Sequence, residues 1–200
     1  ADGSTAALPT TDKVRVRFTK SFIGPKGTNT HAGQTVTVEV KAQITDADTF
    51  SNTATSDKGS NRPHVDGKLG SITINKYDEN YGKENVTSKL LAGAEFSIAP
   101  KDGAKIQFVY VGEEGNTSIY KKATAEEIAN NDIVKVTNLV AKNGTVVAKG
   151  LDNGEYAIVE EKAPSGYSVV SVDNVTISNG DNPVATANVS DTKLHSLPHT

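Results

Sequence analysis

Short runs of alternating apolar and polar residues, separated by turn signals, most strongly limit what this chain can fold into. Two such runs lie at residues 13–20 and 35–40, and a third strand is expected at 50–54. Alternation with a period of two places the apolar side chains on one face of a strand. Hydrophobic residues make up only 36% of the chain, below the ~45–50% of an average soluble protein. The sequence therefore predicts an all-β protein rather than a compact helical one.

The segment from residue 69 to 193 contains a longer series of strands, separated by Gly, Asn and Asp turns. The expected strands are 71–77, 94–99, 105–111, 133–140, 145–150, 155–161, 167–178 and 183–189. Several short strands at this spacing indicate an immunoglobulin-like β-sandwich. One exception is 124–129, where Thr124 and Glu127 form a capping-box pattern that predicts a short surface helix.

Three parts are expected along the chain. Residues 56–68 are rich in Ser, Asp, Gly, Asn and Lys and poor in apolar residues, which is typical of a linker. We therefore expect a smaller or partial β-domain with its linker at 1–68, the β-sandwich at 69–193, and a tail at 194–200.

Composition excludes several function classes. The chain has no cysteine, which excludes disulfides and Cys-based metal sites, and its four histidines (His31, His64, His195 and His199) lack the spacing of a zinc site, so no cofactor or metal is expected. A net charge of −3 with interspersed signs provides no basic stripe for nucleic acid. No apolar run approaches the ~20 residues of a membrane span. The N-terminus also lacks a signal-peptide pattern, so we expect a processed chain with no membrane segment.

Three of the expected strands carry a polar or ionisable residue where the apolar face ends. By period-two alternation, Lys76 follows Ile72 and Ile74, Glu160 follows Tyr156 and Ile158, and Asn188 follows Val184 and Thr186, all pointing inward. A lone buried charge costs several kcal/mol. Two plainer interpretations stay open at this point: each strand ends there in water, or Lys76 and Glu160 form a simple salt bridge.

The sequence resembles a known family at these strands. Tyr-Ala-Ile-Val-Glu-Glu-Lys-Ala-Pro-Ser-Gly-Tyr at 156–167 is similar to the E-box of sortase-assembled, SpaA-like Gram-positive pilins and of the B-type repeats of collagen adhesins. Ser-Ile-Thr-Ile-Asn-Lys-Tyr-Asp at 71–78 resembles the first strand of that domain, and Leu-Ala-Gly-Ala-Glu-Phe at 91–96 resembles its second. The resemblance covers about residues 69–200 and implies a structural protein rather than an enzyme.

This resemblance implies an intramolecular isopeptide bond, with Lys76 as the nucleophile, Asn188 as the electrophile and Glu160 as the proton shuttle. Burial favours the neutral amine of a lysine and the protonated form of a carboxyl group, which suits this chemistry. The protein would then act once, on itself. The resemblance also suggests a second isopeptide bond, between Lys20 and Asn52, with Asp46 or Asp48 as its acid, although a satisfied surface pair is the simpler interpretation of these aspartates.

The C-terminal residues Leu197, Pro198, His199 and Thr200 resemble a sortase sorting motif cut after its threonine. The resemblance implies that sortase joins Thr200 to a lysine of a neighbouring subunit. Lys26, in the turn Gly-Pro-Lys-Gly at 24–27, is the expected acceptor, although a plain turn lysine is the simpler interpretation.

The expected function is therefore that of a backbone subunit of a covalently polymerised pilus, extracellular and anchored to the cell wall. The alternative is a wall-anchored adhesin stalk or tip pilin, which binds a host surface or matrix ligand and needs no acceptor lysine. A hydrolytic or carbohydrate-binding domain fits less well, because aromatic residues make up only 6% of the chain and tryptophan is absent.

Overall fold

The computed structural model describes most of the C-terminal two thirds of the chain and short parts of the rest. The described residues are 16–18, 22, 24, 31, 33–38, 49–55, 63–180 and 183–194. The chain divides into two compact units, Ala1–Gln43 and Ile44–Thr200. Each is described by itself below, and the expected domain boundary near residue 68 stays a prediction.

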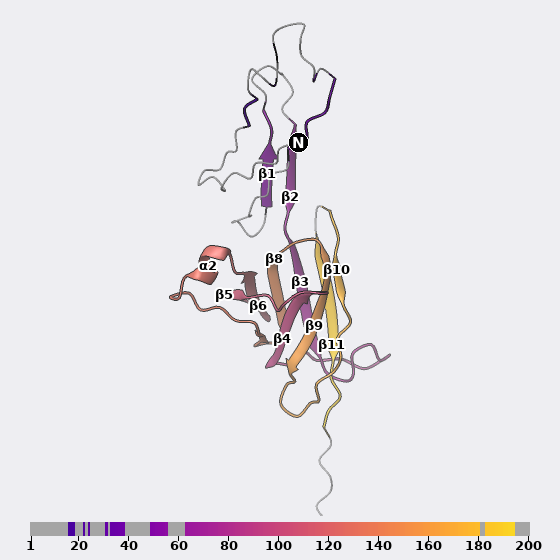
Figure 1. Ribbon diagram of the computed structural model, residues 1–200. Helices are drawn as coiled ribbons and strands as arrows, with labels where there is room; N and C mark the ends of the chain where they lie inside the picture. The colour runs from indigo at the N-terminus through magenta and orange to yellow at the C-terminus, as the bar shows by residue number, and fades with distance from the viewer. Residues whose placement is uncertain are drawn as a thin grey trace, which may run out of the picture. The chain divides into compact units, whose positions relative to one another are not determined.

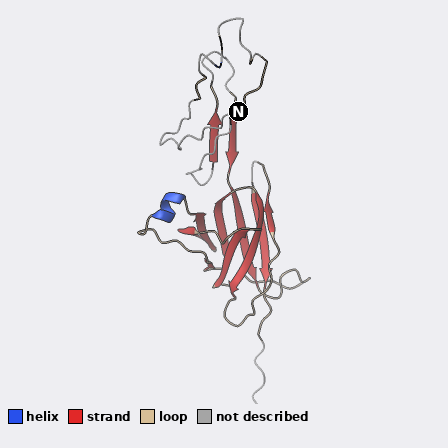
Figure 2. Cartoon of the chain, viewed as in Figure 1, coloured by secondary structure: helices blue, strands red, loops and turns tan. Residues whose placement is uncertain are grey.

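The larger unit contains a two-sheet β-sandwich (Figures 1 and 2). The five-stranded sheet has the order β11 (Val184–Ser190), β3 (Gly70–Tyr77), β8 (Thr145–Leu151), β6 (Thr117–Lys122) and β5 (Phe108–Glu114). The four-stranded sheet has the order β10 (Val175–Ile177), β9 (Gly154–Lys162), β4 (Ala94–Pro100) and β7 (Leu139–Ala141). The predicted all-β sandwich is confirmed.

The last strand of the sandwich lies beside its first. β11 runs parallel to β3, with Val184 opposite Ser71 and Val189 opposite Lys76. β6 and β8 form the second parallel pair, and the remaining strand pairs of the two sheets are antiparallel. The parallel pairing of β11 with β3 brings the end of the domain to the end of β3, although the two strands are more than a hundred residues apart in sequence.

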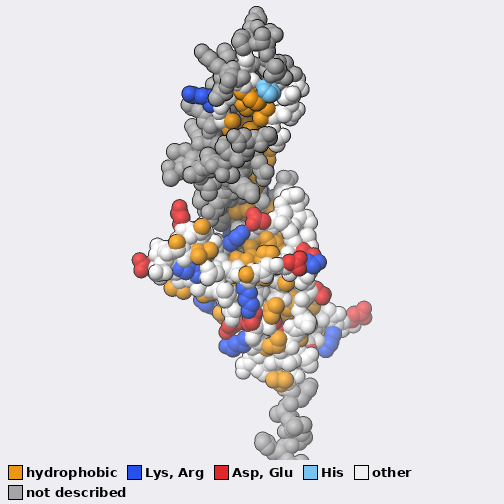
Figure 3. Space-filling model, viewed as in Figure 1, with side chains coloured by type: hydrophobic (Ala, Val, Ile, Leu, Met, Phe, Trp, Pro, Cys, Tyr) orange, Lys and Arg blue, Asp and Glu red, His pale blue; other side chains and the backbone are white. Residues whose placement is uncertain are grey.

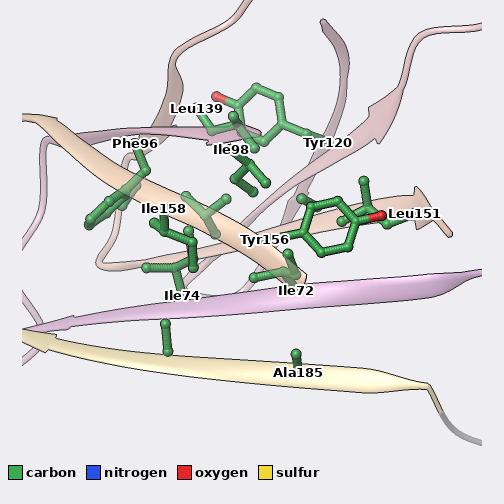
Figure 4. Packing of buried hydrophobic residues seen from close by; sticks show 14 of the residues in the cluster. Ile72, Ile74, Phe96, Ile98, Tyr120, Leu139, Leu151, Tyr156, Ile158 and Ala185 are labelled. Atoms are coloured by element: carbon green, nitrogen blue, oxygen red, sulfur yellow. The ribbon is translucent and has the colours of Figure 1, made fainter. Parts of the chain in front are cut away.

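The core lies between the two sheets and follows the alternation of each strand. On β3 every second residue is buried, and β9 and β11 alternate in the same way along most of their lengths. Figure 4 shows Ile72 and Ile74 of β3 packed against Ile158 of β9 and Ala185 of β11. Burying apolar surface of this kind is the main force that holds the sheets together.

Each of the eight strands predicted for residues 69–193 has a counterpart, five of them with bounds that differ by no more than one residue at either end. The expected strand 105–111 is shifted to β5, 133–140 is reduced to β7, and 167–178 is reduced to β10. β6 was not predicted, because Thr-Ser-Ile-Tyr-Lys-Lys does not alternate in hydrophobicity. The strand pairs with β5 and, in parallel, with β8.

The predicted helix is α2 (Ala125–Ala129). The Thr124 side chain accepts a hydrogen bond from the Glu127 backbone N–H at 3.1 Å, and the Glu127 carboxylate accepts one from the Thr124 backbone N–H at 2.9 Å. Both halves of the expected capping box are therefore formed.

Fewer of the predictions for residues 1–68 are confirmed. β1 (Thr49–Thr53) confirms the third expected strand, but it pairs with β2 (His64–Lys68), so the end of the expected linker 56–68 is a strand. Residues 16–18 and 35–38, the described parts of the runs 13–20 and 35–40, are not strands. Val16 and Phe18 are 49% and 43% exposed, so alternation there is not matched by burial.

Candidate functional site

A lysine and two carboxyl groups are buried together at one end of the core. Lys76 is the last inward residue of the series on β3 and is fully buried. Glu160 on β9 follows Tyr156 and Ile158 on the same face and is 2% exposed. Because β3 and β9 belong to opposite sheets, the lysine and the glutamate face each other across the core.

The second carboxyl group belongs to Asp191, the residue after the end of β11. It lies two positions beyond the buried Val189 and continues the same inward series, so its side chain is only 1% exposed. Its backbone N–H donates to the Tyr77 carbonyl oxygen at 3.1 Å. The backbone of β3 thereby holds Asp191 beside the position of Lys76.

The amine contacts both acids. Lys76 Nζ lies 2.9 Å from Glu160 Oε1 and donates a hydrogen bond to Asp191 Oδ1. The interpretation in which the two strands end in water is therefore wrong. A simple Lys76–Glu160 salt bridge is also incomplete, because one cation faces two carboxyl groups in the same dry site.

Two oxygens of this site, Glu160 Oε1 and Asp191 Oδ2, have no hydrogen-bond partner among the described residues, although Oε1 lies close to the amine. Glu160 Oε2, by contrast, accepts a hydrogen bond from the Val170 backbone N–H at 3.0 Å. A buried acceptor without a donor costs free energy. A proton on Glu160 Oε1 would turn that oxygen from an acceptor into a donor.

Burial raises the pKa of Glu160 above its ordinary value of 4.5, and the negative charge of Asp191 adds to that rise. The Val170 N–H and the Lys76 amine act in the opposite direction and do not offset it. The site therefore favours a protonated Glu160 next to an amine and a second carboxyl group. This is the arrangement that general acid–base catalysis of acyl transfer to an amine requires.

The expected inward position of Asn188 is wrong. Asn188 is exposed, and its Oδ1 accepts a hydrogen bond from Asn75 Nδ2 at 3.0 Å on the outer face of the sheet. The inward residues of β11 are Ala185, Ala187 and Val189, so the strand has the opposite parity to the one expected. Asp191 takes the place that was assigned to Asn188.

Sequence reasoning missed Asp191 because the bulky Val184 was taken as the start of the inward series. The signal that identifies the correct parity is the alternation of Ala185, Ala187 and Val189 with polar residues. Extending that alternation by one more step reaches Asp191.

The remaining predicted residues do not form a second site in the described part of the chain. Asn52 is exposed on β1, opposite Val65 of β2. Its expected partner Lys20 lies outside the described residues, as do Asp46, Asp48, Lys26, Leu197, Pro198, His199 and Thr200.

The described residues contain no group of three or more His, Cys, Asp or Glu side chains arranged to hold a metal ion. A search of their helices likewise finds none with the length and apolarity needed to cross a membrane. Figure 3 shows acidic and basic side chains interspersed on the face of the molecule that it presents.

Comparison with protein families decides where this domain belongs. A family model described as the SpaA prealbumin-like fold domain matches residues 70–193. The chain belongs to this family. The expected SpaA-like resemblance is thus confirmed, and the SpaA-like domain, as residues 70–193 are called below, contains the whole Lys76, Glu160 and Asp191 site.

Solved structures similar to this chain include three pilins. GBS52, the minor pilin of Streptococcus agalactiae, is 19% identical with a TM-score of 0.46, and the match covers 76% of this chain and 63% of that one. The shaft pilin SpaA of Lactobacillus rhamnosus GG is 22% identical with a TM-score of 0.42, covering 68% and 52%. The pilus 2b backbone protein of group B streptococcus is 23% identical with a TM-score of 0.44, covering 80% and 54%.

This chain therefore spans less than two thirds of the length of each of these three pilins. No curated protein sequence matches it.

Proposed function

We propose that this chain is a structural subunit of a Gram-positive surface pilus, and that an amide bond between Lys76 and Asp191 locks its SpaA-like domain. The observation that carries the proposal is the dry site in which Lys76 Nζ contacts the Asp191 carboxyl group with Glu160 Oε1 at 2.9 Å. Membership of the SpaA family supports the role of the domain. The site supports the bond.

The chemistry balances with no external reagent. A proton passes from the Lys76 ammonium group to the Asp191 carboxylate, since a dry site disfavours both charges. The lone pair of Nζ attacks Cγ of Asp191, a C–N bond forms, and the C–O bond to the departing hydroxyl breaks. One water molecule leaves, so the chain becomes lighter by about 18 Da.

Glu160 is the proton shuttle in this scheme. In its protonated form it donates a hydrogen bond to an Asp191 oxygen and polarises the carbonyl group for attack. As the C–N bond forms, Oε1 gives its proton to the leaving hydroxyl, which departs as water, and the carboxylate so formed takes up a proton from Nζ. Glu160 ends the reaction protonated, and the site holds a neutral amide where it held two charges.

The bond would close almost the whole domain into one covalent loop. Lys76 and Asp191 are separated by 115 positions in the sequence. By the loop-entropy argument developed for disulfides, a crosslink of this span stabilises the fold by roughly 4–5 kcal/mol. Force applied to the two ends of the domain would pass through the amide, and the strands between Lys76 and Asp191 would carry little of it.

Assembly into the pilus is proposed to proceed through the C-terminal tail. Sortase would join Thr200, after Leu197, Pro198 and His199, to a lysine of a neighbouring copy, which makes the subunit part of an extracellular, wall-anchored backbone. The resemblance of this tail to a sorting motif supports the proposal. An adhesin stalk or tip pilin would use the same tail without an acceptor lysine.

The crosslink is tested by the intact mass of purified variants. The wild-type chain should be lighter than its sequence by about 18 Da, and Glu160→Ala should have its full sequence mass because no group then moves the proton. Glu161→Ala is the matched control, since Glu161 pairs with Lys105 and Ser97 outside the site and its variant should keep the deficit. If the wild-type chain has its full sequence mass, the proposed crosslink does not form.

The pilus role is tested in cells that carry the matching sortase. Replacing Leu197 or Pro198 should convert high-mass polymers on the cell wall into monomers. Unchanged laddering on a denaturing gel would exclude sortase joining at this tail, whatever the state of the internal bond.

A further inference from the structure

The segment that follows Asp191 is held between two parts of the SpaA-like domain. On one side is a strap, residues 164–170, which lies between β9 and β10 in the sequence. Ser168 N–H donates to the Thr192 carbonyl oxygen at 3.1 Å, and Leu194 N–H donates to the Gly166 carbonyl oxygen at 2.8 Å. Residues 192–194 thus pair with the strap in a short antiparallel bridge.

On the other side is the end of β3 and the residues that follow it. Lys193 N–H donates to Glu79 Oε2 at 2.9 Å, two positions beyond the bond from Asp191 N–H to Tyr77. The contact between Glu79 and Lys193 joins a carboxylate to a backbone donor, the charge-assisted type that is about twice as strong as a neutral hydrogen bond.

The strap also reaches the acid of the site. Its first residues form a tight turn in which Tyr167 N–H donates to Pro164 O at 3.1 Å, with Gly166 at a φ of 85°. Such a turn favours glycine at its third position because that residue needs a positive φ. A few residues later, Val170 N–H donates to Glu160 Oε2. One segment therefore contacts both the acid and the stretch that follows Asp191.

We propose that Glu79 is a positioning residue for the crosslink: by holding Lys193 against the strap, it fixes the carboxyl group of Asp191 at the Lys76 amine. The inference rests on the proposed isopeptide bond and adds a residue that touches none of the reacting atoms. It follows from where Asp191 lies. The β11 ladder with β3 ends at Ser190, and beyond it the single bond from Asp191 N–H to the Tyr77 carbonyl oxygen ties the reacting residue to β3.

Acyl transfer to an amine needs the reacting atoms at about 3–3.5 Å and aligned, and the rate falls steeply when that geometry is loose. The bond from Asp191 N–H to Tyr77 fixes one point of the segment. The contact between Glu79 and Lys193 fixes a second, on the far side of Asp191 from β11. Two fixed points leave the Asp191 side chain little freedom to turn away from Nζ.

The test measures the rate of bond formation during folding of the full chain. The chain is recovered unfolded from inclusion bodies, where it has not yet folded and crosslinked, its full sequence mass is verified, and it is diluted from denaturant into buffer. Intact mass reports the loss of water, while tyrosine fluorescence reports folding in parallel. Glu79→Ala should slow the mass loss by roughly tenfold relative to wild type, the size expected for a hydrogen bond to a charged group, with folding unchanged. Glu79→Gln keeps an acceptor oxygen but not its charge, so its rate should fall between those of wild type and Glu79→Ala.

A second pair of variants tests the same hydrogen bond at its donor, the backbone N–H of Lys193. Lys193→Pro lacks the N–H donor and should slow the reaction as Glu79→Ala does, whereas Lys193→Ala keeps the donor and should react like wild type. The double variant Glu79→Ala/Lys193→Pro should be no slower than either single variant, because both act through one contact.

The outcomes separate this inference from the bond itself. If wild type never loses water, the proposed isopeptide bond fails. If wild type crosslinks and Glu79→Ala crosslinks equally fast, Glu79 has no positioning role. A Glu79→Gln variant as slow as Glu79→Ala, additive effects in the double variant, or folding slowed as much as the mass loss would each overturn the positioning role in favour of a general structural one.

Discussion

Two regions of the same core are built on the same strands yet differ in what holds them together. In the apolar region, Ile74 of β3 packs against Ile158 of β9, and burial alone stabilises the contact. One alternation step further along, Lys76 and Glu160 occupy the equivalent inward positions, with Asp191 beside them. The backbone pattern continues unchanged while the chemistry changes completely.

The comparison teaches that alternation determines which side chains are buried and leaves open how their burial is compensated. Apolar side chains gain free energy from leaving water. A buried ammonium group and two carboxyl groups lose hydration, and their attraction does not reliably repay that loss. The proposed conversion of the lysine and aspartate into an amide would remove the charges, and a covalent bond would then stabilise the ionisable region.

The largest effect is expected from breaking the ionisable region. Lys76→Met removes the nucleophile, so the chain should keep its full sequence mass and its melting temperature should fall by roughly 10–20 °C, as expected for the loss of about 4–5 kcal/mol in a domain of this size. Differential scanning calorimetry measures the fall. Lys83→Met, at an exposed position, is the control and should melt like wild type. A fall of only one or two degrees in Lys76→Met would show that the region carries no crosslink.

Breaking the apolar region should weaken the fold without touching the bond. Ile74→Ala leaves a cavity in a fully buried site and should reduce the free energy of unfolding by about 2–5 kcal/mol. The mass deficit of about 18 Da should remain, because the three reacting side chains are unchanged. Chemical denaturation and intact mass on the same sample check both points. Loss of the deficit in this variant would mean that the two regions are not separable.

A smaller effect is expected in how the melting temperature of Lys76→Met, which cannot form the crosslink, depends on pH. Glu160 has a folded-state pKa raised above its ordinary 4.5, so its protonated form favours the folded state. Its contribution to stability should be complete below about pH 4.5 and should be lost as the pH rises through the folded-state pKa. The melting temperature of Lys76→Met should therefore decline with rising pH more than that of Lys76→Met/Glu160→Gln. Parallel curves for the two variants would contradict the raised pKa.

The smallest effect is expected at Asn188, on the outer face of the same sheet. Asn188→Ala removes one exposed hydrogen bond to Asn75 and should change the free energy of unfolding by less than about 1 kcal/mol. Its mass deficit should equal that of wild type. If Asn188→Ala has its full sequence mass, Asn188 and not Asp191 is the residue that bonds to Lys76.

The sequence predicted the sandwich and two of the three residues of the site. β3 and β9 carry large apolar residues at their inward positions, so alternation placed Lys76 and Glu160 correctly. On β11 the first two inward positions are small alanines, and the exposed Val184 is more hydrophobic than either, so hydrophobicity indicated the wrong face.

The parts that sequence patterns missed depend on pairing between distant segments. β6 has no alternation of its own and is a strand because β8 and β5 lie on either side of it. Asp191 lies beyond the last strand and is buried because its backbone bonds to Tyr77, more than a hundred residues earlier. No local pattern reports such a contact.

Peptide mapping of the wild-type chain tests the central claim most directly. Trypsin cuts after Lys68, Lys83, Lys162 and Lys193, so the residues of the bond fall in the peptides 69–83 and 163–193. The account predicts one branched species that joins these peptides, lighter than their sum by about 18 Da, with fragment ions that place the branch at Asp191. Cleavage after a free Lys76, which gives the separate peptides 69–76, 77–83 and 163–193, or a branch at Asn188 with a loss of about 17 Da, would contradict it.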